Sequence, residues 1–194
     1  MSAPTQPTRY HPFLVTLHWL LALMIGVALF AGGVLLAETP NSDPDKIFML
    51  RAHMSIGILI LLLMLVRLFV RLRTSKPAHA ATGNPMLDKA GTWTHWAFYL
   101  FVILMAGSGI GISVLAGLPP IVFGGSGDPL PADFWAYPPR YAHAIIGNLL
   151  LALIVLHIAA FAWHQWIRKD GLFRRMWFGD RQSWRSRGGS CRPV

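Results

Sequence analysis

Residues 141–167 read YAHAIIGNLLLALIVLHIAAFAWHQWI, and this stretch decides the fold class. It exceeds the ~20 mainly apolar residues that a helix needs to cross a bilayer, yet it contains His143, His157 and His164. His143 and His157 are 14 residues apart. At about 1.5 Å and about 100° per residue, they lie ~21 Å apart along the axis and within ~40° of one face. The stretch therefore predicts a membrane-spanning helix that presents two imidazoles at two depths.

Three further apolar stretches precede this one, over residues 13–36, 47–72 and 92–115. Apolar residues make up 54% of the 194-residue chain, and charged residues only 13%, about half the ~25% of a soluble domain. The first stretch is too long for a signal-peptide core and has no basic leader, so we expect it to be retained. These features predict an all-α fold, an integral membrane four-helix bundle.

Basic residues are distributed unevenly around the four stretches, although Lys and Arg outnumber Asp and Glu by 17 to 8 overall. One side of the bundle receives most of them: Arg9, Arg67, Arg71, Arg73, Lys76, Lys89 and those of the tail. The other side receives Lys46, Arg51 and Arg140. The positive-inside rule then predicts that both termini are cytoplasmic. The basic excess fits membrane lipids as a partner, and no nucleic acid is expected.

Three parts of the chain follow from this arrangement. A cytoplasmic N-terminal segment is expected over residues 1–12, the transmembrane domain over 13–167, and a basic cytoplasmic tail over 168–194. The longest connection, residues 117–140, is rich in Gly and Pro and is expected outside. The single cysteine, Cys191, excludes an internal disulfide framework, a multi-cysteine iron–sulfur site and a c-type haem attachment.

Six of the eight histidines lie within or at the ends of the predicted spans: His18, His53, His95, His143, His157 and His164. Ionisable groups in such places are costly and mark functional sites, whereas His11 and His79 are expected in solvated loops. His53 begins the second span at the outer depth of His143. His18 lies in the first turns of the first span, at the inner depth of His157. Two stacked histidine pairs can therefore form, His53 with His143 and His18 with His157.

Two facing imidazoles suit haem iron better than zinc, because zinc needs four ligands and the spans contain neither Cys nor acidic side chains. Haem iron needs only two axial ligands, and its apolar macrocycle suits a bundle core. Small residues that would admit the macrocycle, or simply pack helices, are Gly57, Gly107, Gly109, Gly111 and Gly147.

Three arginines stand near the predicted pairs. Arg67 lies 14 residues after His53, so it shares that face at the inner depth, either to contact haem propionates or to snorkel to the interface. Arg51 and Arg140 stand just before the outer histidines. They are candidates for propionate contacts or for attracting an anion.

The ordered set of motifs resembles the bacterial cytochrome b561 family. The residues that carry the resemblance are Arg9-Tyr10, LHWL (17–20), RAHMSIG (51–57), RLFVRL (67–72), THWAFY (94–99), His143 and LHIAA (156–160). The resemblance implies two b-type haems with His18, His53, His143 and His157 as axial ligands to the iron, in a multi-pass protein of the bacterial inner membrane. It also implies a ubiquinone site by His164. His95, at the same end, is a second candidate there or a structural histidine.

Two functions fit the resemblance. The first is electron transfer from superoxide, or another external donor, to ubiquinone, which would make the chain an oxidoreductase. The second is a cytochrome b anchor subunit that carries electrons between a partner dehydrogenase or hydrogenase and the quinone pool. A haem-free proton-relaying transporter is disfavoured, because the spans contain no carboxylate and no broken-helix signature.

Overall fold

The structure is a computed structural model that describes residues 7–77 and 85–179. The described elements are, in chain order, α1 (Pro12–Phe30), the π-helical segment η1 (Ala31–Leu36), α2 (Asp45–Arg73), α3 (Pro85–Leu115), α4 (Leu118–Val122), the 3-10 turn η2 (Phe134–Ala136), α5 (Pro138–Ala162), the π-helical segment η3 (Trp163–Arg168) and α6 (Leu172–Arg175). The described part is helical and contains no strand, as predicted. His79 and Cys191 lie outside the described residues.

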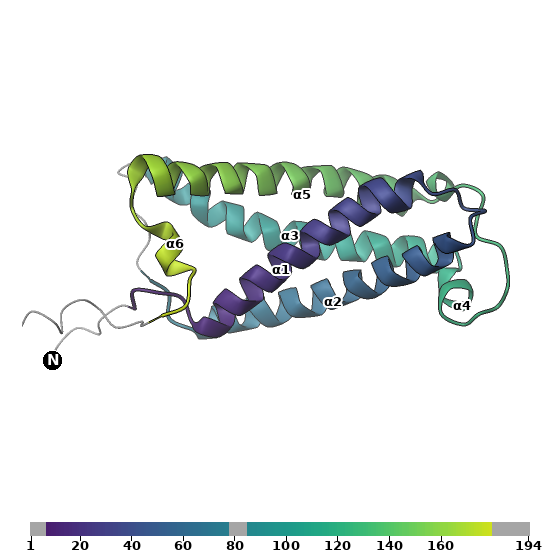
Figure 1. Cartoon of the computed structure of the whole chain (residues 1–194), viewed down its shortest axis with the longest axis horizontal. Coiled ribbons are helices and arrows are strands. Elements are labelled where there is room, and N and C mark those ends of the chain that lie inside the picture. Colours follow the sequence, from purple (N-terminus) through teal and green to yellow (C-terminus); the bar gives the residue numbers. More distant parts are fainter. Residues whose placement is uncertain (1–6, 78–84, 180–194) are drawn as a thin grey trace, which may run out of the picture.

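Four helices are long and apolar enough to cross a membrane, which confirms the predicted number: Pro12–Leu36, Asp45–Arg73, Pro85–Leu115 and Pro138–Arg168. They lie side by side along the long axis of the molecule, with α1 packed on α2, α2 on α3 and α3 on α5 (Figure 1).

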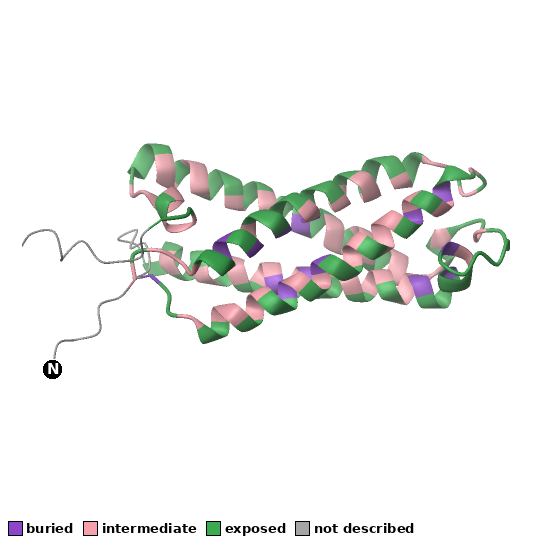
Figure 2. Cartoon of the chain, turned by 60° about the horizontal axis from the view of Figure 1, so that its bottom comes forward, coloured by how far each residue is buried: buried purple, intermediate pink, exposed green. Residues whose placement is uncertain are grey.

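The outward faces of these helices are apolar. Buried residues are few and scattered along the helices, while large hydrophobic side chains such as Leu23, Val114 and Val155 are 67%, 67% and 59% exposed (Figure 2). Such a continuous apolar surface is expected where lipid is the solvent, since helices satisfy their own backbone hydrogen bonds. The chain is therefore a multi-pass membrane protein.

One helix extends beyond the apolar stretch predicted for it. Helix α3 begins at Pro85, several residues before the stretch expected over residues 92–115. Hydropathy marks where a helix enters the membrane, not where it starts. Proline is well tolerated at the first position of a helix, because its missing N–H has no partner there anyway.

Within the Gly- and Pro-rich segment over residues 117–140, helix α4 packs on the bundle as a cap, whereas residues 123–129 are exposed. Gly117, at φ 61°, ends α3 and turns the chain into the short helix α4. Leu118 and Val122 of α4 are 2% and 0% exposed and pack with Leu50 of α2. This cap closes the end of the bundle opposite α6 (Figure 1).

The two ends of the described chain meet at the other end of the bundle. The Tyr10 amide donates to the Arg175 carbonyl at 3.2 Å, and the Trp19 indole donates to the Met176 carbonyl at 3.0 Å. The Arg9 guanidinium donates to the Phe178 carbonyl at 2.6 Å. Helix α6 therefore folds back against the start of α1, and both ends lie on one side of the bundle (Figure 1).

Candidate functional site

His53 of α2 and His143 of α5 face each other near the α4 end. Their ring centroids are 6.2 Å apart, with an interplanar angle of 71°. Glycines adjoin both rings: a Cβ at Gly32 would meet Cε1 of His53 at 2.7 Å, and a Cβ at Gly109 would meet Cε1 of His143 at 3.3 Å. We call His53 and His143 the outer histidine pair.

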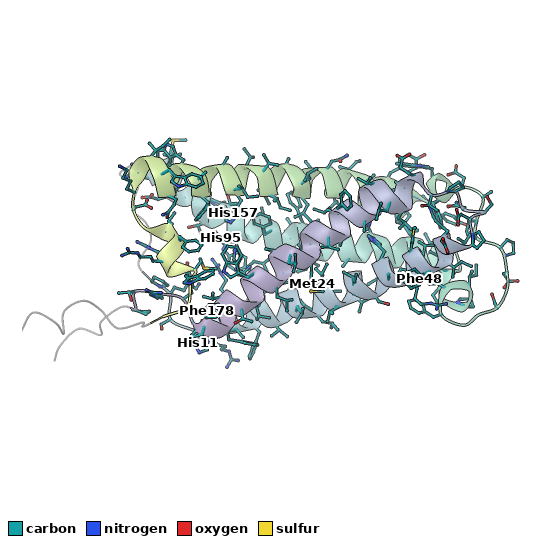
Figure 3. The ribbon with its side chains drawn as sticks, in the orientation of Figure 1. His11, Met24, Phe48, His95, His157 and Phe178 are labelled. Atoms are coloured by element: carbon teal, nitrogen blue, oxygen red, sulfur yellow. The ribbon has the colours of Figure 1, made fainter. Side chains whose placement is uncertain are left out.

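His18 of α1 and His157 of α5 face each other near the α6 end and form the inner histidine pair. Their centroids are 6.4 Å apart, with an interplanar angle of 70°. His157 also lies 5.8 Å from the His95 ring and 5.4 Å from the Phe98 ring. Figure 3 shows His95 and His157 close together at this end of the bundle.

The spacing within both pairs fits a haem iron between the rings. A metal–imidazole bond is about 2 Å long, and the nitrogen lies roughly 1 Å from the ring centre, so two rings on opposite sides of one ion have centroids about 6 Å apart. Nδ1 of His53 is buried without a hydrogen-bond partner in the described part of the chain. Residues 7–77 and 85–179 contain no group of three or more His, Cys, Asp or Glu that could hold a metal ion. A two-ligand haem iron therefore fits this donor set better than a four-ligand ion.

Hydrogen bonding at His143 leaves one ring nitrogen free to bind a metal. The Ser108 hydroxyl donates its only proton to the Met105 carbonyl at 2.8 Å, so it accepts from Nδ1–H of His143 at 3.0 Å. The proton on Nδ1 leaves the lone pair on Nε2. Such a partner fixes both the tautomer and the orientation of a metal-binding imidazole.

The hydrogen bonds of His95 and His18 leave the lone pair on different ring nitrogens. Nδ1 of His95 donates to the Gly91 carbonyl at 2.7 Å, which leaves a lone pair on Nε2. Nδ1 of His18 lies 3.3 Å from Nη2 of Arg67, which can only donate. In that arrangement the lone pair of His18 is on Nδ1 and the proton is on Nε2. Iron can bind Nε2 only if the proton is on Nδ1 instead, and Arg67 then needs another hydrogen-bond acceptor.

The two outer arginines are held at the α4 end. Nε of Arg51 donates to the Val122 carbonyl at 2.7 Å, and Cζ of Arg140 lies 4.3 Å from the Trp135 ring centroid. Both guanidinium groups keep other N–H donors for a propionate or an anion.

His164 and His95 are not brought together. The His164 ring pairs with Asp170, with 2.5 Å between Nδ1 and Oδ2, whereas His95 contacts the inner histidine pair. Oδ1 of Asp170 and Oε1 of Gln165 are buried without partners in the described part of the chain. Both residues line a pocket of about 680 Å³ at the α6 end of the bundle.

Four supporting residues were missed by the sequence analysis. Ser108 and Gly32 gave no signal, because each lies on a different helix from the histidine that it contacts and helical spacing does not relate the two. Asp170 lies in the basic tail, close enough in sequence to His164 to have been considered. Lys46 is only 4% exposed, because its ammonium group donates to the carbonyls of Leu36 and Thr39 and caps the end of the first span.

Four apolar spans with two facing histidine pairs fit a membrane cytochrome of the b type. The chain matches the family described as Prokaryotic cytochrome b561 over residues 9–179, and it belongs to that family. It is 29% identical to "Probable superoxide oxidase CybB" of Yersinia pestis over 171 residues, 87% of this chain and 95% of the relative. It is 28% identical to "Cytochrome b561 homolog 2" of Escherichia coli strain K12 over 179 residues, 91% of this chain and 95% of the relative. It is 26% identical to "Cytochrome b562" of Cereibacter sphaeroides over 181 residues, 89% and 97% of the two chains.

Membership confirms the resemblance read from the sequence motifs. It assigns the chain to transmembrane electron transfer and implies b-type haem as the cofactor.

Proposed function

We propose that this protein transfers electrons from superoxide at the outer side of the bacterial inner membrane to ubiquinone at the inner side, through two b-type haems. It would then be an enzyme, a superoxide:quinone oxidoreductase. The observation that carries the proposal is the pair of facing imidazole sets at two depths, with centroids 6.2 and 6.4 Å apart. The relative named as a superoxide oxidase supports the choice of donor.

The four histidines His18, His53, His143 and His157 are proposed as the axial ligands. A bound haem supplies an iron that changes oxidation state without leaving its ligands. The chain's own task is to hold the imidazoles in place, and the neutral contacts of Ser108, Gly32 and Gly109 do this for the outer pair. The apolar core, which includes Leu150 midway between His143 and His157 on α5, keeps water out of the space between the pairs.

Positive charge at the outer end would attract superoxide, which is an anion. Arg51 and Arg140 lie beside the outer histidines in the sequence, and both are held at the α4 cap. A positively charged surface at the opening of a site raises the local concentration of an anionic substrate.

His164 and Asp170 would serve ubiquinone at the inner end. A quinone takes up protons when it is reduced, and an imidazole paired with a carboxylate can hold and deliver them. Oδ1 of Asp170 is buried and has no hydrogen-bond partner in the described part of the chain. It can therefore accept a hydrogen bond from a bound molecule. His95 is proposed as a second, weaker candidate because it packs on His157.

Both termini are proposed to be cytoplasmic, with residues 1–12 and 168–194 flanking the transmembrane domain over 13–167. Residues 180–194 of this tail lie outside the described residues. The hydrogen bond between Tyr10 and Arg175 supports a common side for both ends, and the charge distribution supports the cytoplasm. In spheroplasts, an impermeant maleimide should label a Ser42→Cys variant and leave the native Cys191 unlabelled. The reverse pattern would invert the topology.

The decisive experiment is an optical and kinetic one on the purified protein. We expect two haems per chain, reduction by superoxide, and oxidation by added ubiquinone. His53→Ala or His143→Ala should each remove one haem's absorbance and abolish superoxide-driven quinone reduction. Ser55→Ala, an exposed position on the same helix as His53, is the matched control. A full two-haem spectrum in either histidine variant contradicts the ligand assignment.

The second candidate function is a cytochrome b anchor for a partner dehydrogenase. It is favoured by two relatives whose names identify them as cytochromes and mention no electron donor. A purified chain that carries two haems, ignores superoxide and is reduced only by a co-purified dehydrogenase would establish this role instead.

A further inference from the structure

Two arginines and a tyrosine in the inner half of the bundle have polar atoms without partners. Arg67 and Arg71 lie one turn apart on α2, and their Cζ atoms are 5.8 and 5.9 Å from the centroid of the Tyr99 ring on α3. Tyr99 is only 3% exposed. Its hydroxyl and Nε of each arginine are buried with no hydrogen-bond partner among the described residues. Three buried donors from two helices therefore lie near the Tyr99 ring.

The cluster contains positive charge that the described chain does not neutralise. Like charges four residues apart on a helix repel each other, and buried charges are costly unless they are paired. Within residues 7–77 and 85–179, neither Arg67 nor Arg71 forms an ion pair with a carboxylate. An anion that is not part of the described residues is therefore needed to neutralise the cluster.

Within the described residues, the one polar contact of Arg67 supports the same conclusion. Nη2 of Arg67 lies 3.3 Å from Nδ1 of His18, a neutral acceptor rather than a counter-ion. Nδ1 must carry a proton if Nε2 of His18 is to bind iron. Loading the inner histidine pair therefore releases Arg67 from His18, and its guanidinium needs an acceptor close by.

We propose that Arg67, Arg71 and Tyr99 form an anion cradle for the two propionate carboxylates of the inner haem. Two carboxylates balance two guanidinium charges, and guanidinium–carboxylate hydrogen bonds are among the strongest in proteins. The Tyr99 hydroxyl adds a neutral donor. The assignment rests on the proposed inner haem and adds Arg71 and Tyr99 to the residues that hold it.

The test compares Arg71→Gln and Tyr99→Phe with Arg71→Lys and Arg73→Gln, all as purified holoprotein in neutral detergent. Arg73 is exposed and stacks on Phe69, with 4.9 Å between its Cζ and that ring centroid, so it is the matched control. Haem per chain and the midpoint potentials of both haems are measured by a spectroscopic redox titration. Loss of a cation beside the carboxylates favours oxidised iron. Arg71→Gln should lower the potential of one haem only, Tyr99→Phe should lower it less, and Arg71→Lys should restore most of it.

The other outcomes are also decisive. Loss of the affected haem in Arg71→Gln, with one haem per chain retained, supports the cradle, since the remaining haem shows that the bundle folds. Two haems whose potentials match those of Arg73→Gln overturn the cradle and leave the proposed function intact. A wild-type protein without haem overturns the proposed function itself. A shift seen only in phosphatidylglycerol vesicles would assign the cluster to a lipid phosphate and overturn the haem assignment.

Discussion

The outer and inner histidine pairs share one geometry but have different surroundings. Their centroid distances are 6.2 and 6.4 Å, and their interplanar angles are 71° and 70°. The outer pair is adjoined by two glycines and a hydroxyl. The inner pair is adjoined by the Arg67 guanidinium and by three further aromatic rings, those of Trp19, His95 and Phe98.

The same imidazole spacing can therefore be held by close packing or within charged surroundings. Close packing depends on side-chain volume, because a well-packed interior resists even one added methyl group. The charged cluster depends on counter-ions instead. The outer site should therefore be sensitive to changes of volume, and the inner site to changes of charge.

The largest expected effect is at Gly32. A Cβ there would lie 2.7 Å from Cε1 of His53, so Gly32→Ala should push that ring out of line, destabilise the fold by about 1–3 kcal/mol and remove the outer haem. Haem per chain and the melting temperature would be measured. Gly33→Ala is the control, because its Cβ meets nothing within 4 Å. Equal haem content in the two variants would show that close packing does not hold the outer pair.

Ser108→Ala should have the next largest effect. It removes the acceptor that fixes the tautomer of His143, and loss of such a partner costs about 10- to 100-fold in metal affinity. Competition for haem with an apo-haem-binding protein would measure this loss. Ser113→Ala deletes a hydroxyl further along the same helix and should retain haem as the wild type does. If Ser108→Ala binds haem equally well, the hydroxyl plays no part in holding the outer site.

Asp170→Asn tests the dependence of the inner site on charge. It leaves His164 with a weaker, neutral partner and should slow ubiquinone reduction about tenfold, with a changed pH profile, while both haem spectra stay as in the wild type. Asp170→Glu should restore most of the rate. An unchanged pH profile in Asp170→Asn would show that the carboxylate is structural.

The smallest effect is expected at Arg140. Its charge lies at the outer rim, against Trp135, so Arg140→Gln should slow reduction by superoxide roughly threefold at low salt and have little effect at high salt. Arg168, whose Cζ lies 5.3 Å from the Trp163 ring centroid at the inner end, provides the matched variant Arg168→Gln. If both variants slow superoxide equally, the outer rim is not where the anion is attracted.

Much of the fold followed from local pattern. The four spans and the two facing imidazole sets were predicted because apolar length and helical period depend only on neighbouring residues. The start of α3 at Pro85 was missed, since a helix can extend beyond the membrane without any apolar signal. The packing of α4 under the cap was missed too, because Val122 is buried only by contact with distant helices.

The supporting residues were harder to predict than the histidines. A histidine in an apolar stretch is costly enough to stand out, whereas Ser108 and Tyr99 are ordinary residues of a membrane helix. Arg67 was singled out from its register with His53. Arg71 was predicted as part of the inner positive charge and of the RLFVRL motif, and its place beside Tyr99 depends on how α2 and α3 face each other.

The apolar pattern alone gives the fold class, the number of membrane-spanning helices and the spacing of the histidines along a helix, because a bilayer requires about 20 apolar residues per span and a helix fixes rise and rotation per residue. Only the tertiary structure decided which side chains meet the rings. Gly32 reaches His53 from the π-helical segment η1, and Asp170 reaches His164 after a second π-helical segment, η3. The physical reason is that such contacts depend on how helices pack and where their winding changes, and neither is encoded in local periodicity.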